Sequence, residues 1–182
     1  LFYNNQAMEG NNPFSGVLKS GSNLKGVVQN SIFWNNSLQD GVSLIKTPFL
    51  SDLIFQNCLV EVDECTQISG QGVTCINNIY NQNPLFENPD SNNFNLLPCS
   101  PAIDMGNNLL LNEELLTDLA GNTRIQNDIV DLGPYESGVF SISANPIIFP
   151  VKCHGNADGS VQFQIENGCE PYNYEWYNGT TN

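Results

Sequence analysis

The feature that most constrains this fold is a short asparagine-centred strand pattern that recurs in the first half of the chain. It occupies residues 28–36, returns at residues 54–60 and returns more loosely at residues 75–80. Aligning Asn30 with Asn57 gives an interval of 27 residues, and the next interval is 21 residues. Repeats of about 20–30 residues, each with a short apolar strand and polar turns, are typical of solenoids. The pattern therefore predicts strands that stack on one another along the chain.

Short strands separated by Asn, Gly and Ser favour an all-β fold, a right-handed parallel β-helix over residues 1–137. Asparagine suits the bends because it tolerates left-handed backbone geometry, and stacked copies hydrogen-bond through their amides. Inward side chains then form apolar ladders, with Ile32, Trp34, Phe55 and Leu59 as core or face positions. A jelly roll is the competing all-β architecture, and it should show alternating strands at more regular spacing.

A longer stretch, residues 83–136, carries a family resemblance. Its motif elements are, in order, residues 83–86, 94–96 and 100–106, then Asp118, Gly121, Arg124 and Asp131, and finally residues 132–136. This order resembles the C-terminal end of bacterial surface proteins that contain right-handed parallel β-helix repeats, with Pro134 where Ala is common. The resemblance implies that the last coils and a closing cap of such a β-helix are present in this chain.

The cap also has a physical rationale. The end of a stack of strands exposes unpaired edges, and these must be covered to prevent edge-to-edge association. Arg124 is the only arginine of the chain, and its nearest motif partners are Asp104, Asp118 and Asp131. We therefore predict a structural Arg–Asp pair that ties the irregular cap to the last coil.

The last thirty residues contain two runs of alternating apolar side chains, at residues 161–165 and 172–176. Alternation at period two predicts strands with one apolar face. Two strands cannot bury a core by themselves, so we expect the chain to be a piece of a longer polypeptide. The preceding segment, residues 138–150, is interrupted by proline and predicts a linker between two modules.

The same thirty residues also resemble a known repeat. The matching residues are Cys153, Gly155, Asp158, Gly159, Gly168, Pro171, Tyr172, Tyr174, Trp176 and Gly179. They resemble the SprB-type repeat of large adhesins from gliding bacteria of the Bacteroidetes type, with Cys169 where a second glycine is usual. The resemblance implies that residues 151–182 are a truncated Ig-like β-sandwich module. It also implies export by the type IX secretion system, whose machinery would be a transient partner.

Charge excludes some partners. The chain has 19 acidic and 5 basic residues, a net charge of −14, and is 40% hydrophobic. Such an acidic chain is repelled by nucleic acid and by anionic lipid, so neither is expected as a partner. No apolar run approaches the roughly 20 residues that a membrane-spanning helix needs, so we do not expect an integral membrane segment.

The six cysteines predict an oxidising compartment. They are Cys58, Cys65, Cys75, Cys99, Cys153 and Cys169, and none forms a Cys-x-x-Cys pair. An even count without metal-ligand spacing favours disulfides in an extracellular or outer-surface protein. We predict a bond between Cys65 and Cys75. The pairing of Cys58 with Cys65 is the rival, and Cys153 has Cys169 or a later cysteine as its partner.

Catalytic and metal motifs are weak in this sequence, and no catalytic or cofactor-binding residue is predicted. A glycosidase needs two carboxylates about 5–10 Å apart, and Glu61, Asp63 and Glu64 form a close acidic cluster that could supply them. The same three residues are weak candidates for binding calcium, the one cofactor considered. A solvated acidic loop is the favoured interpretation of this cluster.

Together these features favour a non-catalytic, adhesin-like protein that is secreted or displayed on the cell surface and binds carbohydrate or cell-surface ligands. One alternative is a carbohydrate-active β-helix enzyme, a polysaccharide lyase or glycosidase, with its site in N-terminal coils that this sequence lacks. The other alternative is a structural stalk that spaces further domains from the membrane.

Overall fold

The computed structural model of the protein describes residues 1–3, 6–7, 18–19, 25–38, 45–46, 52–68, 72–112, 114–173 and 175. The chain divides into two compact units, Leu1–Gly138 and Val139–Asn182. Regular structure in the described residues is β-strand, together with the 3-10 turns η1 (Cys65–Gln67), η2 (Pro89–Ser91) and η3 (Asn108–Leu110).

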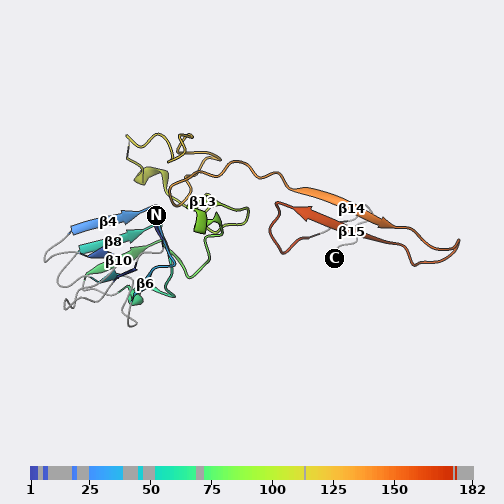
Figure 1. Ribbon diagram of the computed structural model, residues 1–182, viewed down its shortest axis with the longest axis horizontal. Helices are drawn as coiled ribbons and strands as arrows, with labels where there is room; N and C mark the ends of the chain where they lie inside the picture. The colour runs from blue at the N-terminus through green and yellow to red at the C-terminus, as the bar shows by residue number, and fades with distance from the viewer. Residues whose placement is uncertain are drawn as a thin grey trace. The chain divides into compact units, whose positions relative to one another are not determined.

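Parallel strands form most of the first unit. A four-stranded sheet has the order β1 (Phe2–Tyr3), β5 (Ile32–Trp34), β9 (Leu59–Val60) and β11 (Ile79–Tyr80). A three-stranded sheet has the order β10 (Val73–Ile76), β8 (Asp52–Gln56) and β4 (Lys25–Gln29), which lie side by side in Figure 1. Two further parallel pairs join β2 (Gln6–Ala7) with β6 (Ser37–Leu38) and β3 (Leu18–Lys19) with β7 (Ile45–Lys46).

Asparagines make the bends between the two larger sheets. Asn30, Asn57 and Asn77 follow β4, β8 and β10, and their φ angles are 47°, 49° and 50°. This left-handed geometry is open to asparagine at little cost. The prediction that asparagine turns the chain at each repeat is therefore confirmed.

The predicted ladder of asparagine amides is not what holds these bends. Asn30 instead bonds the backbone of Asn107: its Nδ2 donates to the Asn107 carbonyl over 3.0 Å, and its Oδ1 accepts from the Asn107 N–H over 2.9 Å. Asn78 accepts from the Cys58 N–H and donates to the Phe55 carbonyl, over 2.9 Å and 3.0 Å. These amides satisfy buried backbone groups, which otherwise lack a ladder partner.

The four-stranded sheet is buried on both faces. Ile32 and Leu59 point to one face, and their neighbours Phe33 and Val60 point to the other, because side chains alternate along a strand. One face packs on the inward side chains of the three-stranded sheet, where Phe33 and Phe55 meet edge to face with ring centroids 5.7 Å apart.

The second face is covered by the later part of the same unit. The antiparallel hairpin of β12 (Phe86–Asn88) and β13 (Asn93–Leu96) contributes Phe86 and Leu96 to this cluster. The irregular segment after the hairpin, residues 100–137, adds Ala102 and Leu132, which are fully or almost fully buried. The first unit therefore has three layers: the three-stranded sheet, the four-stranded sheet, and the hairpin with the irregular segment.

The prediction of a right-handed parallel β-helix with a cap is wrong. The fold is all-β, but its sheets are small, its strands are short, and the described residues contain no closed or solenoid sheet. After β11 the chain does not add another coil, because it folds back across the second face of the four-stranded sheet. The recurring pattern indicated which strands are neighbours and carried no information about this third layer.

The second unit contains one antiparallel pair, β14 (Ser143–Phe149) with β15 (Ser160–Glu166). The predicted strand at residues 161–165 is confirmed as part of β15. Its partner β14 lies within residues 138–150, the segment predicted as a linker. One face of the pair is apolar, since Pro146 lies opposite Phe163 and Ile148 lies opposite Val161.

The prediction of an Ig-like β-sandwich in the second unit is also wrong. The described residues of this unit show one two-stranded sheet, with no second sheet facing it. Part of the predicted strand at 172–176 lies outside the described residues. Alternation predicted the strand itself, but a sandwich needs a second layer, which the alternating pattern of one strand cannot supply.

Candidate functional site

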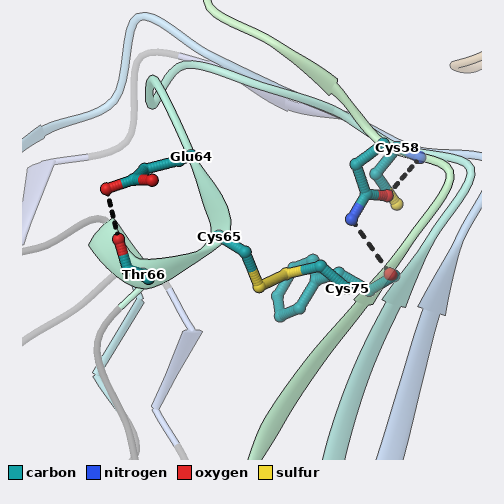
Figure 2. The surroundings of a disulfide bond; sticks show 7 residues. Cys58, Glu64, Cys65, Thr66 and Cys75 are labelled. Atoms are coloured by element: carbon teal, nitrogen blue, oxygen red, sulfur yellow. Dashed lines mark hydrogen bonds between the residues drawn. A yellow bond between two sulfur atoms is a disulfide. The ribbon is translucent and has the colours of Figure 1, made fainter.

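A disulfide closes the connection between β9 and β10. Cys65, on η1, bonds Cys75, on β10 (Figure 2). Their Cα–Cα distance is 6.1 Å. Cys75 lies opposite Phe55 in the parallel register, so the bond joins this loop to the edge of the three-stranded sheet. The predicted pairing of these two cysteines is confirmed, and Cys99 and Cys169 are also disulfide-bonded.

The prediction that every cysteine is oxidised is wrong for two of them. Cys58 and Cys153 are free thiols. Cys58 is fully buried among Phe33, Phe55 and Val60, and its thiol lies 3.5 Å from the carbonyl oxygen of Val28. Burial raises the pKa of the Cys58 thiol to about 11, so it serves as a small apolar core residue. Cys153 is exposed in the second unit.

The three acidic residues that are weak candidates for binding calcium have separate hydrogen-bond partners. Glu61 accepts from the Asn35 N–H over 2.6 Å, Asp63 accepts from the Asn81 amide over 2.6 Å, and Glu64 accepts from a hydroxyl within the same turn. Among the described side chains, no group of three or more His, Cys, Asp or Glu residues is arranged to hold a metal ion. Calcium binding stays a prediction from the sequence.

A buried network of carboxylates holds the irregular segment. Arg124 forms an ion pair with Glu136, and the two side chains are 7% and 1% exposed. Arg124 also donates to the Gly133 carbonyl over 2.8 Å and to the Asp131 carbonyl over 3.4 Å. The predicted Arg–Asp pair is thus corrected to an Arg–Glu pair, with Asp131 reached only through its backbone.

The three predicted aspartates belong to the same network but bind backbone N–H groups. Asp131 accepts from Asp104 over 2.7 Å and from Ser137 over 2.6 Å. Asp118 accepts from the Glu136 N–H over 3.0 Å and from two N–H groups of its own turn. The structural role predicted for these residues therefore rests on hydrogen bonds from backbone N–H groups. It does not rest on direct contact with the arginine side chain.

Burial and hydrogen bonding shift the pKa values in this network in opposite directions. Burial raises the pKa of Glu136 to about 7, although the Asp131 N–H and the charge of Arg124 favour its ionised form. Burial would also raise the pKa of Asp118, but its bonds from Glu136 and Asn122 hold that pKa below its ordinary value. Burial raises the pKa of Asp104, and the charges of Asp131 and Asp128 add to this shift.

A hollow lies between the end of β5 and the β12–β13 hairpin. Its volume is about 290 Å³, and it is lined by two aromatic residues, two asparagines and three aliphatic residues: Trp34, Phe86, Asn35, Asn83, Leu85, Pro89 and Leu97. Trp34 packs against the buried cluster of Leu59 and Phe86 while remaining partly exposed. The lining is neutral: rings and aliphatic groups form most of it, and amides supply its polarity.

Sequence reasoning missed this hollow. It assigned Trp34 to the core or to a strand face, and the structure places it at a boundary, packed on one side and open to the hollow on the other. The sequence feature that could have indicated the hollow is the Trp34–Asn35 pair at the end of a strand. That signal is incomplete, because the opposite wall comes from a hairpin about fifty residues later in the chain.

Within the described residues, no helix is long and apolar enough to cross a membrane. Comparison with protein-family models, with curated proteins and with solved structures finds no match to this chain.

Proposed function

We propose that this chain is part of a secreted or surface-displayed, adhesin-like protein that binds carbohydrate without catalysis. The hollow beside Trp34 is the observation that carries the proposal. Aromatic rings stack on the apolar C–H faces of sugars, and amides both donate to and accept from hydroxyl groups. Small-molecule sites commonly combine an apolar lining with a few well-placed polar groups.

The hydrogen bonds around the hollow favour a prepared site. The Asn83 Oδ1 accepts from the Leu85 N–H over 2.9 Å, so the amide nitrogen is the group that can donate to a ligand. Asn35 is positioned by its backbone bond to Glu61, and its φ angle is 53°. A fixed site loses little conformational entropy when a ligand binds.

The lining supports retention of a ligand over its cleavage. Hydrolysis of a glycosidic bond requires two carboxylates that flank the bond. The polar groups that line this hollow are the amides of Asn35 and Asn83, which are too weak as acids and bases for that role. Binding without turnover is the activity that this lining chemistry supports.

The oxidised cysteines support the extracellular part of the proposal. The Cys65–Cys75 bond and the oxidised Cys99 and Cys169 suit an oxidising compartment, where disulfides persist. The SprB-like residues of the second unit support the finer proposal of a surface adhesin exported through the type IX system.

The test is a binding titration of the purified chain with a panel of neutral oligosaccharides. We expect Trp34→Ala to weaken binding at least about tenfold, since a central aromatic residue commonly contributes more than 1.4 kcal/mol. Phe149→Ala is the matched control, because Phe149 is a half-exposed aromatic of the second unit and should leave affinity unchanged. Thermal midpoints of both variants check that they fold.

Two results contradict the proposal. New reducing ends in the incubated oligosaccharides would show turnover and so remove the non-catalytic assignment. Equal affinity of the folded Trp34→Ala variant and the original chain would show that the hollow is not the binding site.

A further inference from the structure

We propose that the hollow beside Trp34 selects a sugar bearing a 2-acetamido group, an N-acetylhexosamine, in preference to the parent hexose. This inference rests on the proposed carbohydrate-binding function and names the ligand class of the same site. Three observations carry it: the size of the hollow, its neutral lining, and its unequal walls.

The size favours one sugar ring. At about 290 Å³ the hollow lies just below the roughly 300–1,000 Å³ that ligand sites commonly span. Its lining has no charged side chain, and the net charge of the chain is −14. An acidic sugar would enter without a cationic partner and against this charge, so the ligand is neutral.

The two walls differ in chemistry. The strand end contributes Trp34 and Asn35, whereas the hairpin side contributes Phe86 and Asn83 and adds the aliphatic groups of Leu85, Pro89 and Leu97. A plain hexose has hydroxyl groups around its rim, and a hydroxyl pressed against aliphatic groups loses its water partners without replacement. An acetamido group solves this mismatch, because its methyl suits the aliphatic wall and its amide pairs with an asparagine.

One residue of the aliphatic wall, Leu85, has an unfavourable backbone geometry. Leu85 has a φ angle of 52°, a left-handed geometry that is unfavourable for a leucine. Two hydrogen bonds hold it there: the Leu85 N–H donates to Asn83 over 2.9 Å, and the Leu97 N–H donates to the Leu85 carbonyl over 2.8 Å. Strained residues that their surroundings fix in this way concentrate at binding sites.

The test uses tryptophan fluorescence in a chain carrying Trp176→Phe, which leaves Trp34 as the single remaining tryptophan of the two. The probes are two matched pairs of monosaccharides: N-acetylglucosamine with glucose, and N-acetylgalactosamine with galactose. We expect at least one acetamido sugar to bind at least about tenfold more tightly than its parent, with a saturable change in Trp34 emission.

A set of leucine variants then locates the preference. Leu97→Ser should bring the acetamido sugar and its parent to near-equal affinity, while Leu97→Met should keep the preference because it keeps the apolar wall. Leu116→Ser is the matched control, since Leu116 is an exposed leucine that does not line the hollow. It should keep the preference unchanged.

The outcomes separate this inference from the proposed function. Saturable binding with equal affinity for acetamido and parent sugars would overturn the acetamido preference and leave carbohydrate binding standing. An unaltered preference in the folded Leu97→Ser variant would also overturn it. No saturable response to any saccharide, here and in the oligosaccharide panel, would overturn both proposals.

Discussion

The parallel strands β4 to β11 and the irregular segment at residues 100–137 belong to one unit but pair their buried backbone groups differently. In the strand region, parallel registers join β4, β8 and β10, and the core is apolar around Phe33 and Phe55. In the irregular segment, a β-bridge joins Thr117 with Thr123, and carboxylates accept several of the backbone N–H groups.

This difference follows from the rule that buried backbone donors need partners. A strand supplies partners through its neighbour, whereas the irregular segment combines backbone pairs, such as the Gly106 N–H with the Val130 carbonyl, with side-chain acceptors. Asp118, Asp131 and Glu136 are acceptors of this kind, and Arg124 offsets part of their charge. The strand region is therefore stabilised mainly by apolar burial, and the irregular segment by a network whose strength depends on charge.

The largest expected effect on the irregular segment comes from Arg124→Met. Removing the cation leaves the Glu136 carboxyl group, only 1% exposed, with the Asp131 N–H but without its cationic partner. We expect a loss of roughly 3–5 kcal/mol in the free energy of unfolding, the usual result of breaking a buried ion pair from one side. Urea denaturation measures this loss, and hydrogen exchange should place it first in residues 100–137.

Two controls accompany this variant. Lys152→Met removes an exposed cation from the second unit and should change stability by no more than about 0.5 kcal/mol. Adding Glu136→Gln to Arg124→Met should recover part of the loss, because the unpaired charge is then gone. If the Arg124→Met variant were as stable as the original chain, the network would not be what holds this segment.

The second prediction concerns the strand region. Replacing both Cys65 and Cys75 with alanine should lower the free energy of unfolding by roughly 2–3 kcal/mol, the chain-entropy value for a loop of this length. Faster hydrogen exchange should appear at the edge strand β10, with little change in residues 100–137. Substitution is preferred to a reductant, since Cys99 and Cys169 are also oxidised.

Cys153→Ala is the matched control for the disulfide, because Cys153 is free and exposed. It should leave the unfolding midpoint unchanged. A double alanine variant with the stability of the original chain would show that the loop between β9 and β10 is held by Ile68 and its apolar neighbours alone.

The sequence predicted local features well, because local residues determine them. Left-handed bends at Asn30 and Asn57 follow from asparagine chemistry, and the strand at residues 161–165 follows from alternation. The Cys65–Cys75 bond was predicted because both cysteines flank one polar loop.

The features that failed depend on distant contacts. Burial of Ile32 and Leu59 by Ala102 and Leu132 creates the third layer, and no repeat in the sequence encodes that approach. Likewise, the partner of Arg124 had to be chosen among several nearby acids, and only packing selects Glu136. The hollow beside Trp34 has the same origin, since its two walls come from separate parts of the chain.

The smallest expected effect is a dependence of stability on pH that belongs to the irregular segment. Burial raises the pKa of Glu136 from 4.5 to about 7. Between these two pH values, the folded chain holds a proton that the unfolded chain has released. The contribution of this proton to the free energy of unfolding is complete below the ordinary pKa of Glu136. It is lost as the pH rises through the folded-state pKa. The raised pKa of Asp104 acts in the same direction at lower pH, while the lowered pKa of Asp118 opposes both in acid.

We therefore expect the thermal midpoint to be highest in mildly acidic solution, to fall by a few degrees between about pH 5 and pH 7, and then to level off. The charge of Arg124 is already part of this balance, since it holds the pKa of Glu136 below the value that burial alone would give. Glu136→Gln should flatten the profile in this range, whereas replacing the single, exposed His154 with glutamine should leave it unchanged. A midpoint that rises across this range would mean that the folded chain favours the ionised form of Glu136, so that pairing with Arg124 outweighs burial in the network.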